Sequence, residues 1–232
     1  MRLGSRVSGL VLVVLVLAAM LFGAAVKRQI PDDYNPLVQL DLSAKPNFIT
    51  PIKLRMLSGN TRACIAVLRK ESVDVQAMPE RTDEPGCYRR GTITFSRLSR
   101  AGFEPEEMRC DLALRLYLLE RHGIQPLARR YFNSDVDRIH HFGSYSCRTI
   151  RGSWRQSQHA TANAFDLAGF GLADGRGISL KNDWHTGGPA ARFLRDVRGQ
   201  ACQWFNIVLS PDYNADHSDH FHFDMGWFRG CR

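Results

Sequence analysis

Several motifs that would assign this chain to a common class of site are missing from its 232 residues. The six cysteines include no CxxC pair, which argues against a zinc knuckle or a dithiol redox motif. There is no HExxH segment, so a thermolysin-type zinc site on one helix is excluded. Internal repeats and low-complexity tracts are absent as well. Lysine and arginine are scattered and form no basic helix or arm, so nucleic acid is not an expected partner.

The residues that are present fit one globular domain of ordinary size, or one domain with a small addition. Hydrophobic residues make up 44% of the chain, which is enough to build a core. The net charge of +8 favours an anionic partner such as acidic lipid headgroups or an acidic cell-wall polymer. A soluble surface with surplus arginine would give the same charge, so the composition leaves both interpretations open.

One long hydrophobic run lies at the N-terminus. Residues 9–26 contain no charged side chain, and Lys27 and Arg28 end the run. Its eighteen residues are at the lower limit for a membrane-spanning helix and exceed most signal-peptide cores. We therefore expect residues 1–28 to be an uncleaved membrane anchor, or alternatively a signal segment cleaved near the small residues 23–25. Either would carry the rest of the chain across a membrane.

The six cysteines agree with export. Their number is even and their spacing is wide, which predicts up to three disulfides in an oxidising compartment. Six free thiols would instead require a reducing cytosol, and the sequence does not choose among the possible pairings. Residues 29–60 contain four prolines, which prevent a long helix and predict a linker. We expect the catalytic domain to occupy residues 61–232.

The second part of the chain predicts a mixture of helices and strands. Helices are expected over 61–70, 104–122 and 189–205, the second beginning at Pro105 and ending at Gly123. Strands are expected over 92–96, 164–172, 205–210 and 219–225. Helices on one side of a small antiparallel sheet give an α+β fold.

Four of the eight histidines lie in two short segments, 157–170 and 217–224, which also contain aspartate. His159 and Asp166 are seven residues apart, so neither a straight strand nor a straight helix would let both contact one ion. If they share a metal, the chain must turn between them. Residues 160–163 are small and polar enough to form that turn.

The second segment alternates His220 and His222 with Phe221 and Phe223. On a strand, both imidazoles would lie on one face while both phenylalanines enter the core. Two imidazoles and one carboxylate are a frequent ligand set for catalytic zinc. An HxH pair on a strand is, however, more often a surface pair or a hydrogen-bond donor, so spacing alone leaves both interpretations open.

Residues 157–166, SQHATANAFD, resemble the SxHxxGxAxD motif of the zinc D-alanyl-D-alanine peptidases, a metallopeptidase superfamily that shares its fold with the Hedgehog signalling domain. HSDHFHFD at 217–224 is similar to the second motif of that superfamily. The more detailed resemblance is to a branch of it, the bacterial extensin-like C-terminal domain, and covers residues 61–232. It also includes SYSCR at 144–148 and residues 193–214. One departure is Ala162, where the wider family commonly has glycine, and a positive φ there would strain alanine.

The resemblance implies one zinc ion per chain, held by a site on the sheet. Its ligands would be His159, Asp166 and His222. Asp219 and His220 occupy the positions of the proton carrier. The favoured base is Asp219, with His220 as a stabilising or relay group and His217 as a further candidate.

The resemblance also implies groups that contact the substrate. Arg148 resembles the family arginine that stabilises the developing oxyanion or a substrate carboxylate, with Arg151 and Arg155 as alternatives. Ser157 is similar to a residue that donates a hydrogen bond to the substrate, although it also fits an ordinary turn. Cys147, which directly precedes Arg148, would anchor the loop that carries Arg148 through a disulfide. We hypothesise that its partner is Cys202.

Family and expected export together imply a zinc-dependent peptidoglycan peptidase of DD-carboxypeptidase or endopeptidase type. Its partners would be peptide stems or cross-links of the bacterial cell wall. It would lie in the cell envelope, either anchored in the inner membrane with a periplasmic domain or secreted to the periplasm. The alternative is a non-catalytic, zinc-containing cell-wall-binding module of the same fold. Such a module would be expected to have lost its base, yet Asp219 and His220 are both present.

Overall fold

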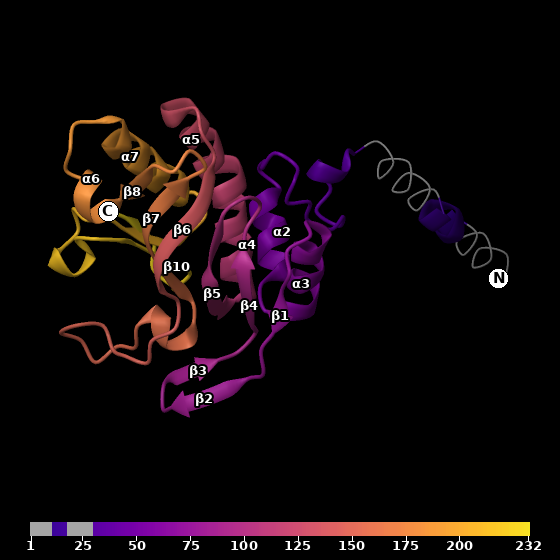
Figure 1. Ribbon diagram of the computed structural model, residues 1–232. Coiled ribbons are helices and arrows are strands. Elements are labelled where there is room, and N and C mark those ends of the chain that lie inside the picture. The colour runs from indigo at the N-terminus through magenta and orange to yellow at the C-terminus, as the bar shows by residue number, and fades with distance from the viewer. Residues whose placement is uncertain (1–10, 18–29) are drawn as a thin grey trace, which may run out of the picture.

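The computed structural model describes residues 11–17 and 30–232 (Figure 1). Residues 11–17 are helical and exposed, and the remainder of the expected anchor or signal segment lies outside the described residues. Among the described residues, no helix combines the length and the apolar character needed to cross a bilayer.

A nine-stranded sheet forms the centre of the domain (Figure 1). In spatial order its strands are β1 (Gln76–Ala77), β4 (Thr92–Arg97), β5 (Gly102–Arg109), β6 (Val136–Gly143), β7 (Ala164–Leu172), β10 (Phe221–Asp224), β9 (Ile207–Leu209) and β11 (Gly230–Cys231), with β8 (Gly177–Ser179) also paired to β7. Neighbouring strands are antiparallel except β5 with β6 and β9 with β11. The predicted α+β class is confirmed, but the sheet is larger than expected and is mixed rather than purely antiparallel.

The helices and the remaining short elements surround this sheet. The α-helices are α2 (Thr50–Leu57), α3 (Thr61–Lys70), α4 (Cys110–Leu119), α5 (Gln125–Phe132), α6 (Leu180–Asp183) and α7 (Pro189–Ala201). A π-helical turn, η2 (Glu120–Ile124), joins α4 to α5, and short 3-10 turns are η1 (Asp32–Tyr34), η3 (Gln158–Thr161) and η4 (Ala215–His217). A separate hairpin of β2 (Arg81–Glu84) and β3 (Cys87–Arg89) extends from the body of the domain (Figure 1).

The helix expected over residues 104–122 begins later than predicted and does not end at Gly123. Residues 104–109 belong to β5, and the helical segment starts at Cys110 and continues through η2 into α5. Pro105 lies where the pairing of β5 with β4 shifts register, between Glu106 opposite Phe95 and Gly102 opposite Arg97. A register shift tolerates a residue without a backbone N–H, so the proline does not interrupt the strand.

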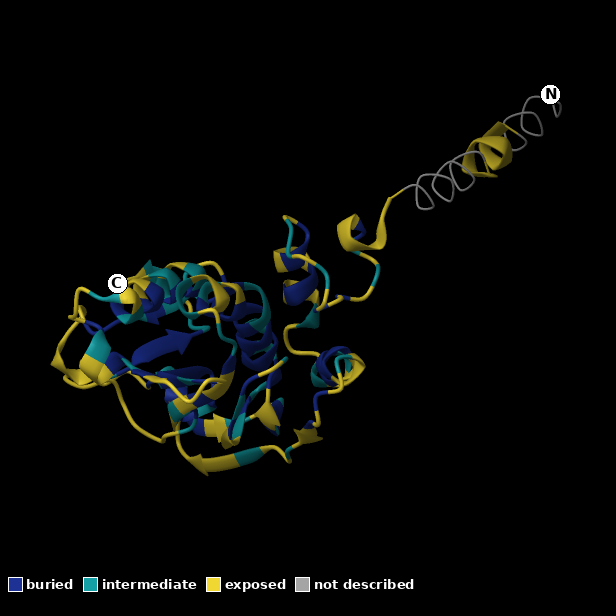
Figure 2. Cartoon of the chain, turned by 45° about the horizontal axis from the view of Figure 1, so that its top comes forward, coloured by how far each residue is buried: buried dark blue, intermediate teal, exposed yellow. Residues whose placement is uncertain are grey.

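The alternation of side chains along β7 and β10 separates the core from the site. Phe165, Phe221 and Phe223 are at most 1% exposed and lie in the main hydrophobic cluster. His222 pairs directly with Asp166 across the two strands, so both side chains lie on the opposite face of the sheet. The prediction for the HxH segment is therefore confirmed for His222 and the two phenylalanines, but β10 begins at Phe221, and His220 lies in the bend just before it. Figure 2 shows the buried residues gathered in the central strands and in the helices packed on them.

The proline-containing segment before the first helices also contributes to the core. Leu40, Leu42 and Leu54 are buried in the main hydrophobic cluster, and Pro51 lies in the first turn of α2, where its missing N–H costs nothing. The side chain of Lys53 is buried too, and its Nζ donates to the carbonyl of Asp32 at 2.8 Å. This segment packs on the domain rather than only leading up to it.

Three disulfides form, as the even cysteine count predicted. They join Cys64 to Cys110, Cys87 to Cys147 and Cys202 to Cys231. The hypothesised Cys147–Cys202 pair is wrong. Cys202 follows α7, where the last strand, β11, brings Cys231 beside it, whereas Cys147 lies in the loop that the β2–β3 hairpin contacts.

Candidate metal centre

His159 is held in place by the short helical turn that precedes β7. Ser157 caps this turn, its Oγ accepting a hydrogen bond from the backbone N–H of His159 at 3.3 Å. Ala162 ends the turn in the left-handed region, with φ 51°. This conformation strains an L-alanine, but it reverses the chain between His159 and Asp166. The turn that the spacing required is therefore present, together with the strain anticipated at Ala162.

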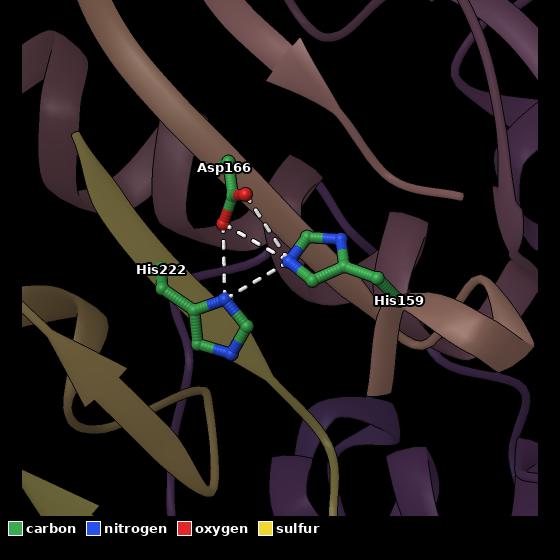
Figure 3. A group of neighbouring side chains, drawn as sticks. All are labelled: His159, Asp166 and His222. Atoms are coloured by element: carbon green, nitrogen blue, oxygen red, sulfur yellow. Dashed lines mark hydrogen bonds and ion pairs between the residues drawn. The ribbon is translucent and has the colours of Figure 1, made fainter. Parts of the chain in front are cut away.

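The turn brings three side chains from separate parts of the sequence together. His159 Nε2 lies 3.2 Å from Asp166 Oδ1 and 3.1 Å from His222 Nδ1, and that nitrogen lies 2.9 Å from Asp166 Oδ1 (Figure 3). All three residues are buried, and one ligand atom from each lies within 4.8 Å of the others. Two imidazole nitrogens and one carboxylate oxygen converging on one point are a donor set suited to a divalent cation.

The outer nitrogens of both histidines have partners of their own. His159 Nδ1 lies 2.8 Å from the carbonyl oxygen of Ser144, and His222 Nε2 lies 3.0 Å from Asp224 Oδ2. When these nitrogens carry the proton and donate it, the inner nitrogens are left with free lone pairs. The residues present therefore fit a metal ion in both their donor set and their supporting contacts.

Asp224 was not identified as a functional residue from the sequence. Its burial at 7% exposure and its contact with His222 place it among the residues that support the site. The signal was available, because the side-chain period of two that pairs His220 with His222 continues to Asp224. Ser144 had no comparable signal, since its contribution is a backbone carbonyl.

The electrostatics of the group follow from its burial and its hydrogen bonds. Burial opposes ionisation of Asp166, but hydrogen bonds from His159 and His222 outweigh this and hold the pKa of the carboxyl far below its usual range. Burial likewise opposes a charge on His222, but hydrogen bonds to Asp166 and Asp224 raise its pKa to about 9. A cation that bound His222 Nδ1 would therefore have to displace a proton at neutral pH.

His220 and Asp219 form a pair at the edge of this group. His220 Nε2 lies 3.6 Å from Asp166 Oδ1, while its Nδ1 lies 2.8 Å from Asp219 Oδ1. The Asp219 side chain is 39% exposed and is on the outer side of His220. Of the two predicted proton carriers, His220 is therefore the one whose ring nitrogen faces the three converging side chains.

His217 lies beside these histidines. Its ring centroid is 5.3 Å from that of His220 and 5.8 Å from that of His222, and its Nδ1 lies 2.6 Å from Asn214 Oδ1. Burial, together with the positive charges of His222 and His220, lowers the pKa of His217 to about 4. All the histidines singled out in the two segments are thus brought together.

The predicted substrate-contacting residues differ in their positions. Arg148 Nη2 lies 3.9 Å from Asp166 Oδ2 and its side chain is 55% exposed, so it borders the group and remains accessible. Arg151 is engaged with Asp216 at 2.5 Å, and the guanidinium of Arg155 lies over the ring of Phe228.

The loop that carries Arg148 is attached to the β2–β3 hairpin by the Cys87–Cys147 disulfide. The same loop is held at its start, where the hydroxyl of Ser144 donates to the carbonyl of Ala164 at 2.6 Å. Ser157, at its end, uses its hydroxyl oxygen to cap η3. Arg148 therefore borders the group from a segment anchored at three points.

A family model described as "Extensin-like protein C-terminus" matches residues 62–232. No curated protein and no solved structure matches the chain.

Proposed function

Because the chain belongs to the extensin-like protein C-terminus family, we propose that it is a zinc-dependent peptidoglycan peptidase of the D-alanyl-D-alanine peptidase superfamily. The proposed reaction is hydrolysis of a peptide bond between D-amino acids in cell-wall stems or cross-links, by a carboxypeptidase or endopeptidase route. The observation that carries the proposal is the buried convergence of His159, Asp166 and His222.

The metal would be held by those three side chains, which leaves a coordination position for solvent or substrate, as in catalytic zinc sites. When bound, a zinc ion supplies Lewis acidity, so that water ionises near neutral pH and a carbonyl is polarised. The chain supports this chemistry by fixing both imidazoles through Ser144 and Asp224. Rigid outer contacts keep the ligands positioned, which limits the reorganisation needed during the reaction.

We assign proton transfer to His220. Its Nε2 faces Asp166 Oδ1 at 3.6 Å, and its Nδ1 can donate to the carboxylate of Asp219. An imidazole oriented by a carboxylate can accept a proton from attacking water and return it to the leaving amine. Asp219, which the resemblance favoured as the base, would then act by orienting His220. His217 remains a candidate for a second proton carrier.

Arg148 is suited to stabilise negative charge on the substrate. Its guanidinium is accessible and borders the metal ligands, and its loop is restrained by Cys87–Cys147. A guanidinium donates two parallel hydrogen bonds to a carboxylate, or one to a developing oxyanion. Ser157 would contribute to substrate binding through its hydroxyl proton, since its oxygen already accepts from the backbone.

The three disulfides and the net charge of +8 support a site of action outside the cytosol, against an anionic polymer. We propose that the protein acts in the bacterial cell envelope, attached to the inner membrane or released into the periplasm.

The test is hydrolysis of two substrates by the full-length, zinc-loaded protein: a soluble stem pentapeptide ending in D-alanyl-D-alanine, and a purified cross-linked muropeptide dimer. Release of D-alanine identifies a carboxypeptidase, and conversion of the dimer to monomers identifies an endopeptidase. Chelation and His159→Ala should abolish either activity. His220→Ala should lower kcat by about 10²–10⁴-fold while zinc remains bound, the range typical of a lost acid–base group.

The matched control is His185→Ala, which removes an exposed histidine from the loop between α6 and α7. It should retain full activity and full zinc content. A wild-type protein that binds zinc and hydrolyses neither substrate would support the non-catalytic wall-binding module instead. Hydrolysis that persists after complete removal of the metal would contradict the proposed chemistry.

A further inference from the structure

A large groove among the described residues does not contain the metal ligands. It runs between α2, the start of α4, the η3 turn, the end of α7 and the C-terminal loop. Ser157 and Gln158 line it and directly precede His159, and Met225 lines it and directly follows Asp224. The groove is therefore lined by residues that directly adjoin His159 and Asp224 in the sequence. A smaller hollow that shares Tyr88, among other residues, extends it towards the β2–β3 hairpin.

An exposed tryptophan stands at one side of the groove. Trp227 is 97% exposed, in contrast to Trp184, which is fully buried in the core. The loop that carries Trp227 is fixed: the backbone N–H of Gly226 donates to Asp224 Oδ1 at 2.7 Å, and Asn206 Nδ2 donates to the carbonyl of Gly226 at 2.6 Å. The Cys202–Cys231 disulfide holds the far end. A large indole held in water on a restrained loop is typical of a binding surface.

The residues that line the groove carry more positive than negative charge. Four arginines line the groove, whereas Asp111 is its single carboxylate and pairs with Arg109 at 3.3 Å. Arg55, Arg115 and Arg229 have no carboxylate within ion-pair distance in residues 30–232. Arg55 and Arg229 are exposed and approach the groove from α2 and the C-terminal loop respectively.

Arg115 is the most informative of these cations. Its Nη1 donates to the carbonyl of Trp204 at 3.0 Å, but its Nε is buried and has no hydrogen-bond partner. Burial lowers the pKa of this guanidinium, opposed by the charge of Asp111. A half-buried cation without a carboxylate in ion-pair contact is costly in the free protein, and an anion bound in the groove would offset that cost.

We propose that this groove binds a peptidoglycan strand, with a sugar ring stacked on Trp227 and the carboxylates of the strand's peptide stems paired with Arg55 and Arg229. Sugar rings present a flat C–H face that packs on an indole, and stem carboxylates match the geometry of a guanidinium. The inference rests on the proposed function. It assigns to the groove the retention of the polymer, separately from the hydrolysis of one bond at the metal centre.

The experiment measures both properties on the full-length, zinc-loaded protein. Binding is followed by co-sedimentation with purified sacculi on ice, and hydrolysis by the soluble substrates described above. The variants are Trp227→Ala and the double variant Arg55→Glu with Arg229→Glu. The control is Arg130→Glu with Lys181→Glu, which makes the same change in net charge at exposed positions on α5 and α6.

We expect the groove double variant to weaken sacculus binding by at least about tenfold, since two charge-assisted hydrogen bonds are lost and the new carboxylates repel those of the stems. Trp227→Ala should also weaken it, and the control pair should bind within about twofold of wild type. Hydrolysis of the soluble substrates should be unchanged in the control pair. Added salt should reduce the difference between wild type and the groove double variant, because it screens the exposed charges.

The inference is overturned if the groove variants sediment with sacculi as wild type does, or if the control pair loses binding equally. It is also overturned if only binding of single-stranded DNA, measured in parallel, depends on these residues, because that would make the groove a nucleic-acid site. Failure of the proposed function would give a different result. The protein would then cleave no substrate, yet its binding to sacculi would still depend on the groove residues.

Discussion

Replacing Asp224 by asparagine should weaken zinc binding although Asp224 is not a proposed ligand. Its Oδ2 lies 3.0 Å from His222 Nε2, and both residues are buried. Asparagine has nearly the same shape, but its amide group donates hydrogen bonds where the carboxylate accepts. If the amide faces Nε2, the proton of His222 is driven to Nδ1, the nitrogen that lies 2.9 Å from Asp166 and should bind the metal.

The opposite orientation of the asparagine does not restore the site. Asp224 Oδ1 also accepts a hydrogen bond from the backbone N–H of Gly226 at 2.7 Å. If the amide nitrogen of the asparagine turned away from His222, it would face this N–H, and two hydrogen-bond donors would meet. Loss of such an outer contact lowers metal affinity by about 10–100-fold, or roughly 1.4–2.7 kcal/mol. The measurement is the zinc dissociation constant, obtained by competition with a calibrated chelator and compared at one pH.

The matched control is Asp219→Asn. Asp219 contacts His220 at 2.8 Å in a similar way, but His220 is not a proposed ligand, so the zinc dissociation constant should change by less than about threefold. Circular dichroism and thermal unfolding of the chelated proteins verify that both variants fold. A folded Asp224→Asn protein with wild-type zinc affinity would refute the tautomer argument, and an equal loss in both variants would show a general effect of charge.

Three further predictions concern stability. Ala162→Gly should change the free energy of unfolding by less than about 1 kcal/mol, because relief of left-handed backbone strain is offset by the greater chain entropy of glycine and by the loss of a buried methyl group. Ala162→Val should instead destabilise the protein by about 2 kcal/mol or more. If denaturant titrations gave the same loss of stability for both variants, strain at this position would be excluded. Replacing Cys87 and Cys147 together by serine should cost about 4 kcal/mol, from the loop closed over 60 residues, and wild-type stability of that variant would contradict this. Burial and the charge of Glu71 raise the pKa of Tyr117 to about 12, so its contribution of roughly 2 kcal/mol should be present below pH 10 and lost as pH rises towards 12. Tyr117→Phe should flatten that pH profile, and an unchanged profile would assign the alkaline loss to other groups.

Parts of the candidate site could be predicted from short-range rules, whereas the choice of His159, Asp166 and His222 as one group came from the family resemblance. The period of two in β10 decided which face carries His222, and His220, in the bend just before the strand, approaches the same group. The distance between His159 and Asp166 demanded a turn, and small residues were available to make it. Asp224 needed one further step along the same alternation.

The wider fold could be predicted less well because it depends on pairing between distant segments. Residues 102–109 have helix-compatible residues and a proline, yet they form β5. Glu107 in that strand accepts hydrogen bonds from Thr92 and Arg81, and it also pairs with Arg89. Contacts of this kind override local helix propensity, and nothing in the segment itself reveals them. The cysteine pairing failed for the same reason, since Cys147 and Cys87 are close only after the hairpin has packed.

The pairing of β7 with β10 has a consequence for the order of events as the protein matures. His159 and His222 are 63 positions apart, so the three donors are assembled only after interior strands of the sheet have joined. A partly synthesised or unfolded chain has no such metal site. Metal binding would therefore come late in folding and would stabilise the completed fold. Divalent ions compete for such ligands according to their local supply as well as their affinity. The compartment in which these strands join, rather than the one in which the chain is synthesised, would then decide which ion the mature molecule carries.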